Sequence, residues 1–393
     1  MPTNTYFHGT KTNLLQTSSL AITMPATSII GIIATSSDAD AATFPLDTPA
    51  LITDVRAALA KAGTQGTLAT ALAAIADQCS PTIIVVRVAT AVAPESQDTL
   101  VEGTYAGGTY TGAKALLMAE AVTGFRPRII GAPGLASEAV VNALIPIAQQ
   151  LRAMVYALAV GADVPSAVTY AGNFGARELM LLWPETTVGH GDCEARALGL
   201  RAAIDQSVGW HKSLSNVVIN NMDGLALDVS FALDGSSSDA TLLNDANITT
   251  LIARNGFRFW GNRTTSSIPA YSFEVATRTS QALAEAIDDA LFADNDKPLT
   301  AGLIKDILGS LNATFRKLAT PGANQRLIGA TAWFDPTENA AAALANGQVV
   351  IDYDFTPVAP MEGLTNNQRI TDRYYSDFSA QLQSVNATVA ASS

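Results

Sequence analysis

The chain has 393 residues, of which 48% are hydrophobic and 15% are charged. A chain of this length exceeds what one hydrophobic core organises, so two or three domains are expected. The formal net charge of -12 argues against a nucleic-acid-binding protein, which needs an excess of Lys and Arg to neutralise phosphates. A monomer can hide apolar surface only in its own core, so this composition indicates extensive contacts between subunits.

The cysteine spacing and the absence of signal-peptide and membrane-span patterns further restrict the class of protein. Cys79 and Cys193 lie far apart without a CxxC motif, so neither a disulfide nor a structural zinc site is expected. The N-terminus lacks the basic start and apolar core of a signal peptide, and no window reaches the roughly 18 uninterrupted apolar residues of a membrane span. These features predict a soluble, unexported chain without direct membrane insertion.

The first part of the chain alternates between apolar strands and helices after a polar arm. Residues 1–24 are Thr-rich and lack helical periodicity, and Pro25 ends them. The elements predicted next, in chain order, are strand 28–34, helix 49–62, a helix ending near 78, strand 82–88, helix 113–122, strand 127–132, helix 137–153, strand 154–160 and strand 178–183. This alternation predicts an α/β domain with a mainly parallel sheet at about residues 25–250. Residues 89–112 interrupt it with a Gly- and Thr-rich excursion that includes a small hairpin.

From about residue 251 the pattern predicts an α+β unit that extends to residue 393. Its expected elements are a strand within 256–264, helices near 273–293 and 300–319, and strands near 327–334 and 348–356. In the last strand, alternate residues share a face. One face carries Val349, Ile351, Tyr353 and Phe355, and the other carries Val350, Asp352 and Asp354.

Motifs for enzymatic chemistry are weak. The chain has no Gly-x-x-x-x-Gly-Lys-Ser/Thr phosphate loop, Gly-x-Ser-x-Gly elbow or His-Glu-x-x-His site. The turn Gly131–Gly134 follows a strand and precedes a helix, but Pro133 removes a backbone donor that a phosphate loop needs. We interpret it as a plain strand-to-helix turn.

The segment His190–Glu194 offers four metal-ligand types within five residues, but distant partners are scarce because the chain has only three histidines. A helix cap by Asp192 is the favoured interpretation. Asp352 and Asp354 could imitate paired catalytic carboxylates, although an acidic interface edge is the commoner outcome. No catalytic residue, metal or cofactor is therefore expected.

The densest local pattern is Gly256-Phe-Arg-Phe-Trp-Gly-Asn-Arg-Thr264, in which Gly256, Arg258, Trp260, Gly261, Asn262 and Arg263 stand out. On its own this pattern fits a core strand whose arginines form local ion pairs, followed by a turn. The sequence closely resembles a signature of contractile tail sheath proteins, the subunits of phage tails and R-type bacteriocins. Further segments that resemble the family are Phe7–Gly9, Leu20–Pro25, Trp210–Asn216, Leu242–Ile248, Leu344–Phe355, Pro360 and Ile370–Asp372.

This resemblance implies a structural subunit that needs no cofactor. Sheath subunits form six-fold rings stacked helically around an inner tube protein. Baseplate and tail terminator proteins lie at the two ends of this stack. The assembly waits in a metastable extended state and contracts to drive the tube through a cell envelope. The implied location is a virion tail or bacteriocin particle that assembles in the bacterial cytoplasm of the host.

The resemblance also assigns candidate roles to residues. The arm and the C-terminal strands are expected to exchange strands between subunits, through Tyr6, Phe7, His8, Val349, Val350, Ile351, Tyr353 and Phe355. A basic helix of the C-terminal inner domain is expected to contact the tube, through Lys305, Arg316 and Lys317. An ordinary solvated helix face explains these three cations equally well. Two other functions stay open: an α/β enzyme with a nucleotide or small-molecule ligand, and a non-contractile tube or ring component.

Overall fold

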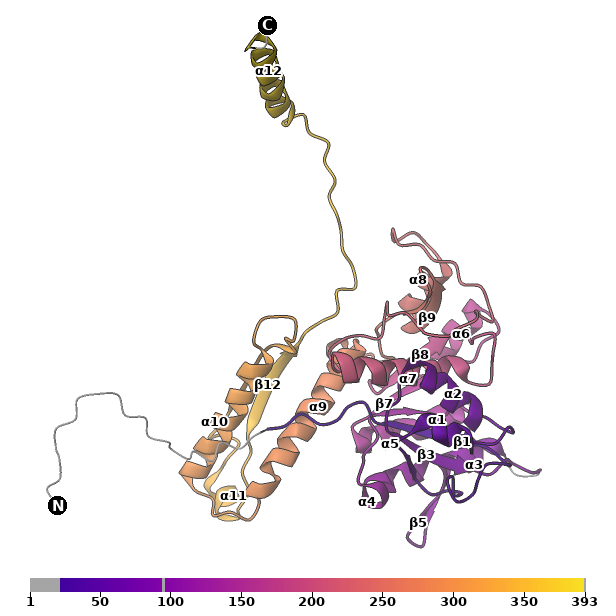
Figure 1. The fold of residues 1–393 in the computed structure, drawn as a ribbon. Coiled ribbons are helices and arrows are strands. Elements are labelled where there is room, and N and C mark those ends of the chain that lie inside the picture. The colour runs from indigo at the N-terminus through magenta and orange to yellow at the C-terminus, as the bar shows by residue number, and fades with distance from the viewer. Residues whose placement is uncertain (1–21, 94–95, 392–393) are drawn as a thin grey trace, which may run out of the picture. The chain divides into compact units, whose positions relative to one another are not determined.

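The computed structural model describes residues 22–93 and 96–391 of the chain. They fall into two compact units, one that ends at Pro360 and one that begins at Met361. Within the described residues, the larger unit contains an eight-stranded sheet, a two-stranded sheet formed by β11 and β12, and a short hairpin formed by β4 and β5 (Figure 1).

The large sheet is mainly parallel, as the alternation of helices and apolar strands predicts. Its strands, in pairing order, are β10 (Phe257–Trp260), β9 (Ile248–Ala253), β8 (Leu179–Trp183), β7 (Met154–Leu158), β6 (Ile129–Gly131), β1 (Ile30–Thr35), β3 (Ile83–Val88) and β2 (Ala50–Ile52). The edge strands β10 and β2 pair antiparallel with their neighbours, and the strands between them pair parallel. All residues of β1 and β3 are buried, because helices cover both faces of the sheet.

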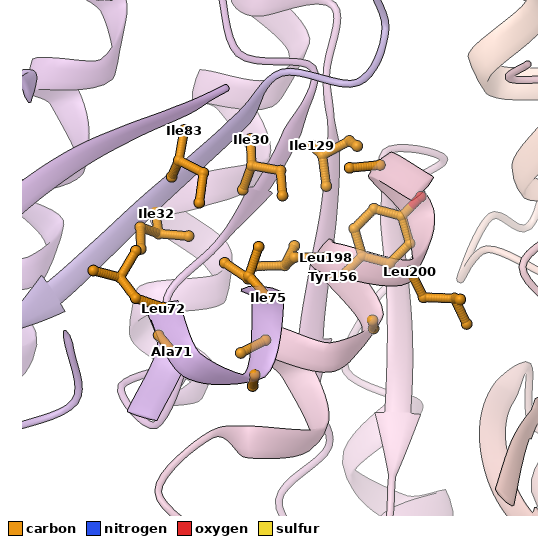
Figure 2. Close-up of a cluster of buried hydrophobic side chains, with 14 of the residues drawn as sticks. Ile30, Ile32, Ala71, Leu72, Ile75, Ile83, Ile129, Tyr156, Leu198 and Leu200 are labelled. Atoms are coloured by element: carbon orange, nitrogen blue, oxygen red, sulfur yellow. The ribbon is translucent and has the colours of Figure 1, made fainter. Parts of the chain in front are cut away.

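One face of the sheet packs against α1 (Val55–Leu59), α2 (Leu68–Gln78) and α7 (Asp192–Ser207). Figure 2 shows this core, in which Ile30 and Ile83 of the sheet lie near Ile75 of α2 and Leu198 of α7. Each such side chain contributes about 1.5–3 kcal/mol through its burial.

The opposite face is covered by α3 (Gln97–Glu102), η1 (Gly112–Met118), α4 (Ala119–Thr123), α5 (Glu138–Leu151), α6 (Val164–Ala171) and α8 (Asp239–Asp245). Alternate residues of β7 divide between the two cores: Met154 and Tyr156 enter the first, whereas Val155 and Ala157 enter the second. The sheet is therefore the middle layer of an α/β arrangement.

The structure confirms one sequence-based prediction about this layer and corrects another. The expected hairpin is confirmed, since β4 (Tyr105–Ala106) pairs with β5 (Thr109–Tyr110). The predicted helix 49–62 is wrong in its first part, because β2 pairs there with β3 and only α1 is helical. Ala50 and Ile52 are buried while Leu51 is 37% exposed, which is the period of two of a strand.

The C-terminal part of the larger unit has its own core. Its elements are η2 (Pro269–Tyr271), α9 (Glu274–Leu291), η3 (Phe292–Asp294), α10 (Ala301–Leu318), β11 (Leu327–Trp333), α11 (Ala341–Ala345) and β12 (Asp352–Pro357). Leu283 of α9 packs there with Leu311 and Phe315 of α10 and with Leu327 of β11.

The last strand begins at Asp352 rather than at the predicted residue 348. The buried side chain of Asn339 explains the difference. Its Oδ1 accepts the N–H of Val350 at 2.8 Å, and its Nδ2 donates to the Val350 carbonyl at 2.9 Å. A side-chain amide thus replaces the partner strand at Val350.

The smaller unit contains α12 (Tyr375–Ala391), which the sequence patterns did not predict. Side chains from Met361 to Gln383 are exposed, and Ile370 is 99% exposed. Across the described residues, no helix combines the length and apolar character needed to cross a bilayer.

Glu194 of α7 is a carboxyl group placed inside the first core. Its side chain is fully buried, and Oε1 accepts the N–H of Ala132 at 2.7 Å. Oε2 has no hydrogen-bond partner among the described residues. Burial raises the pKa of Glu194 to about 8, because a charged carboxylate is poorly solvated there.

We expect Glu194→Gln to flatten the pH dependence of stability. Between about pH 4.5 and 8 the folded chain keeps a proton that the unfolded chain releases, so wild-type stability falls as pH rises, by up to about 1.4 kcal/mol per pH unit. Urea unfolding at pH 5 and pH 8 measures this slope. Glu138→Gln, at an exposed carboxyl in the first turn of α5, should keep it. A Glu194→Gln variant with the wild-type slope would contradict the assignment.

Candidate functional site

The Gly256–Thr264 signature begins as the edge strand β10 of the large sheet. This corrects its predicted place in the C-terminal α+β unit, and the predicted boundary after residue 250 runs through β9. The edge of β10 that faces away from β9 is covered by the segment 216–219. The Asn216 N–H donates to the Phe259 carbonyl at 2.7 Å, and the Ile219 N–H donates to the Phe257 carbonyl at 2.9 Å.

Arg258 fixes this edge through main-chain oxygens. Its guanidinium donates to the carbonyls of Arg254 at 3.1 Å, Asn216 at 2.9 Å and Asn255 at 3.4 Å. The expected ion pair is therefore wrong for Arg258, whose partners are carbonyls. Trp260 contributes differently, with its ring edge-on to Phe231 at 5.0 Å between centroids.

Gly261 allows the chain to leave the sheet at close range. Its φ is +142°, and a Cβ at this position would lie 2.7 Å from the Cα of Thr249. Both the positive φ and the backbone contact require glycine. The signature thus contains a close crossing of two main-chain segments.

The end of the signature leads directly into α9. The Asn262 carbonyl accepts the Glu274 N–H at 3.0 Å, and the Thr264 N–H donates to the Ser272 carbonyl at 2.8 Å. The guanidinium of Arg263 lies over the Phe273 ring, 5.1 Å from its centroid. The signature therefore joins the large sheet to the first turn of α9.

A buried charge network lies where α9 meets the sheet layer. It consists of Arg201 and Asp205 of α7 and Glu274 and Arg278 of α9, whose side chains are 0–3% exposed. Arg201 contacts Asp205 at 2.7 Å and Glu274 at 3.3 Å. Arg278 pairs with Asp205. Two positive and two negative charges thus balance inside the protein.

Tyr156 of β7 completes this network. Its hydroxyl donates to Glu274 Oε1 and accepts a hydrogen bond from Arg278 at 3.3 Å. Burial, followed by the nearby Glu274 carboxylate, raises the pKa of Tyr156 well above its usual value. Burial alone would lower the pKa of Arg278, but the Asp205 carboxylate, Tyr156 and the Glu274 carboxylate together outweigh burial and raise that pKa.

The face of α9 that carries Glu274 and Arg278 also contacts residues just before β6 and β7. These residues lie at the amino edge of the sheet, where its parallel strands begin. Gln281 Nε2 donates to the Ala153 carbonyl at 2.9 Å, Glu285 pairs with Arg128, and Asp288 pairs with Arg152. Spacings of three and four residues place these groups on one helix face. The opposite face presents Leu283 and Ile287 to the C-terminal core. α9 is therefore polar toward the sheet layer and apolar toward α10 and β11.

The His190–Glu194 cluster does not converge as a metal site. No group of three or more His, Cys, Asp or Glu side chains in the described part of the chain could hold a metal. The predicted Asp192 cap is wrong, because the Glu185 carboxylate accepts the N–H groups of Gly191 at 3.0 Å and Cys193 at 2.7 Å. Asp192 instead accepts from Thr186 Oγ1 and Arg196 Nε, each at 2.7 Å.

The Gly131–Gly134 turn lies at the switch between β6 and β1, where ligands bind in many open α/β sheets. Here the chain itself fills the crevice. A Cβ on Gly191 would lie 2.0 Å from the Gly134 nitrogen and 2.3 Å from the Pro133 carbonyl carbon. The backbone packing at this point leaves the enzyme alternative without its most favourable ligand position.

The predicted strand-exchange residues are only partly described. Tyr6, Phe7 and His8 lie outside the described residues. Ile351, Tyr353 and Phe355 pack against the C-terminal core, and the Tyr353 ring lies 5.9 Å from Phe315 and 6.3 Å from Phe355 between centroids. Val349 is half-buried, and Val350 is 42% exposed. The single-face prediction therefore holds for Ile351, Tyr353 and Phe355.

The three cations predicted on α10 are all exposed, but they do not share one surface. Lys305 and Arg316 are eleven residues apart and lie on one helix face. Lys317 lies about 100° around the helix and lines a groove with Met24, Trp210 and Arg326.

Sequence patterns missed the buried network. Arg201 and Asp205, and likewise Glu274 and Arg278, are spaced i,i+4, which is also the spacing of ordinary exposed ion pairs on helices. What distinguishes the buried pairs from exposed ones is the burial of α7 itself, which only the fold shows. Arg201 is flanked along the helix by the buried residues Ala197, Leu198, Leu200 and Ala202.

Family models match most of the chain. Residues 108–265 match the phage tail sheath protein central domain, residues 27–88 match the tail sheath protein Gp18 domain III N-terminal region, and residues 266–371 match the phage tail sheath C-terminal domain. Among solved structures, the anti-feeding prophage helical sheath in the contracted state is similar with a TM-score of 0.69 at 15% identity, covering 94% of this chain and 99% of that one. The contracted sheath complex of the PVC extracellular contractile injection system is similar with a TM-score of 0.68 at 14% identity, covering 95% and 99%.

Curated relatives extend over nearly the whole chain. The tail sheath protein of Escherichia phage P2 is 45% identical, covering 96% of this chain and 99% of the relative. The major tail sheath protein of Serratia phage KSP20 is also 45% identical, covering 95% and 97%. A prophage major tail sheath protein of Pseudomonas aeruginosa is 32% identical, covering 95% and 98%. The chain therefore belongs to the phage tail sheath proteins, which are structural proteins and not enzymes.

Proposed function

We propose that copies of this chain form six-fold rings stacked helically around an inner tube, and that the stack contracts from a metastable extended state to drive the tube through a cell envelope. The observation that carries this proposal is 45% identity to a phage tail sheath protein over 96% of the chain. The free energy of contraction comes from interfaces that are better satisfied in the contracted packing. Each subunit contributes a small gain that the number of copies multiplies.

The free edge of β12 is the proposed joint between subunits. Ala332 of β11 exchanges hydrogen bonds with the Asn312 side chain of α10, at 2.9 and 3.0 Å, so its main-chain groups point away from β12. Ala332 lies opposite Tyr353, and directly opposed residues of an antiparallel pair orient their main-chain groups alike. The N–H and C=O groups of Tyr353 and Phe355 therefore point to the edge of β12 that no described strand occupies.

Strand addition at this edge would join subunits by main-chain hydrogen bonds that tolerate rotation of the domains outside the joint. The proposed donor strands are the N-terminal arm, with Tyr6, Phe7 and His8, and the C-terminal segment. Exposed apolar side chains support the second donor, since Leu364 is 69% and Ile370 is 99% exposed. Val349, Val350 and Ile351 lead into the acceptor strand.

We expect Phe355→Ala to assemble into helical particles and Phe355→Pro to remain unassembled. Both variants lose the aromatic ring, but only proline removes the outward N–H. Electron microscopy of the purified proteins measures the result, and wild type should show two helical pitches among its particles. Circular dichroism controls for folding of both variants.

Equal assembly of the two variants would contradict strand addition at Phe355. Wild-type protein that stays monomeric or dimeric would contradict the sheath function itself. Tubes of a single pitch under all conditions would favour a non-contractile component.

Lys305 and Arg316 form the proposed contact with the inner tube protein, because both are exposed on one face of α10. Exposed ion pairs contribute only about 0.2–1 kcal/mol each, so such a contact can hold through many copies and still release on contraction. Lys317 is a weaker candidate, since it lines the groove beside Trp210.

We expect the double variant Lys305→Glu and Arg316→Glu to fold normally and to give sheaths that are contracted or empty of tube. Reversed charges should weaken attachment to the tube while leaving strand addition intact. Counting tube-filled extended particles by electron microscopy measures this, with the double variant Arg56→Glu and Lys61→Glu, at exposed residues outside α10, as the control of equal charge change. Normal numbers of filled, extended tails from the double variant would place the attachment elsewhere.

The remaining proposals concern layout and partners. Residues 1–24 would form the arm, the sheet layer would form the outer domain, and α9 to β12 would form the inner domain near the tube. Baseplate and tail terminator proteins are the proposed partners at the two ends of the stack. Assembly would occur in the cytoplasm of the host bacterium, without contact to nucleic acid or insertion into a membrane.

A further inference from the structure

A hollow of about 300 Å³ lies where β9 turns into β10. Its walls include the rings of Phe231 and Trp260 and the side chain of Leu233, which is 62% exposed. Arg254 and Arg258 also line it, and no carboxylate residue is among its lining residues. The hollow therefore combines aromatic surface with two positive charges.

The two arginines differ in what they can offer a partner. Arg258 donates to three main-chain carbonyls and to Asn216 Oδ1, and none of these partners is a carboxylate. Arg254 is exposed, with its guanidinium 5.8 Å from the centroid of the Phe231 ring. Among the described ion pairs, none includes Arg254 or Arg258. This chemistry suits an apolar side chain flanked by carboxylates.

The chain presents that chemistry at the turn between α9 and α10. Phe292 is 77% exposed there. Asp289, Asp294 and Asp296 lie within four residues of Phe292 in the chain, and Lys297 is the only basic residue between positions 289 and 300. Lys297 pairs with Asp294 at 2.6 Å, so Asp289 and Asp296 keep their charges available.

The hollow and the Phe292 turn belong to opposite edges of the large sheet. Arg254 follows β9, which runs parallel to β8, β7 and β6, and so lies at the carboxyl edge. α9 contacts Arg128 and Ala153, which directly precede β6 and β7 at the amino edge. A contact between the hollow and the turn would therefore join different copies.

We propose that the Arg254 hollow receives the Phe292 turn of a second copy of this chain. Phe292 enters between Phe231 and Leu233, and Asp289 and Asp296 face the two arginines. Such a contact uses two different surfaces, so it is head-to-tail and propagates through a stack of subunits that share one orientation. The inference rests on the proposed sheath function, because it requires many copies in a helical array.

Cross-linking between two single variants tests this contact. Leu233→Cys protein and Phe292→Cys protein are mixed in equal amounts, assembled, and treated with a short bis-maleimide. We expect a cross-linked dimer that each variant assembled alone does not give. Val122→Cys, at a residue 55% exposed on α4, replaces Phe292→Cys in the matched control and should give only background. The native Cys79 and Cys193 are half-buried and buried, and wild-type protein controls for them.

A charge reversal gives a second, independent measurement. Arg254→Glu should abolish or strongly slow assembly, and adding Asp289→Lys and Asp296→Lys to the same chain should restore it. Normal helical particles without the Leu233–Phe292 product, or with Arg254→Glu assembling like wild type, would overturn this inference and leave the sheath function standing. A wild-type protein that forms no helical particles would overturn both.

Discussion

Two arginines and two carboxylates share one dry site between α7 and α9, and this network fixes how the large sheet meets the C-terminal helices. Arg201, Asp205, Glu274 and Arg278 are each at most 3% exposed. Removing one partner from such a set leaves a buried charge unpaired, which typically costs 3–5 kcal/mol. The four residues therefore act together, and they define one relative position of α7 and α9.

Because α9 has one polar and one apolar face, it connects the sheet layer to the C-terminal core. Its polar face contacts the sheet layer as far as Asp288, while Leu283 and Ile287 enter the C-terminal core. The signature supplies the covalent path into the same helix through the close crossing at Gly261. A subunit built this way can pass force from one layer to the other. The edge of β12 that no described strand occupies is the proposed site of the joint between copies.

Sequence patterns predicted the layers better than the contacts between them. Apolar runs located β1, β3, β7 and β8 to within about two residues, because buried parallel strands are continuous in hydrophobicity. The short edge strand β2 was hidden inside an apparent helix. The network was also hidden, since an i,i+4 ion pair has the same pattern whether it is buried or solvated. The start of β12 depended on Asn339, which lies 11 residues from Val350, and no local pattern reports such a contact.

The role of the network is tested most directly by urea unfolding of the Arg278→Ala variant as an unassembled subunit. One probe reports on the sheet layer and a second reports on the C-terminal core. We expect a loss of stability of about 3–5 kcal/mol and the separation of one unfolding transition into two, because α9 would no longer be fixed to α7. Arg56→Ala, at an exposed residue of α1, should change stability by less than about 0.5 kcal/mol. An Arg278→Ala subunit that unfolds in one transition with near wild-type stability would contradict the central role of the network.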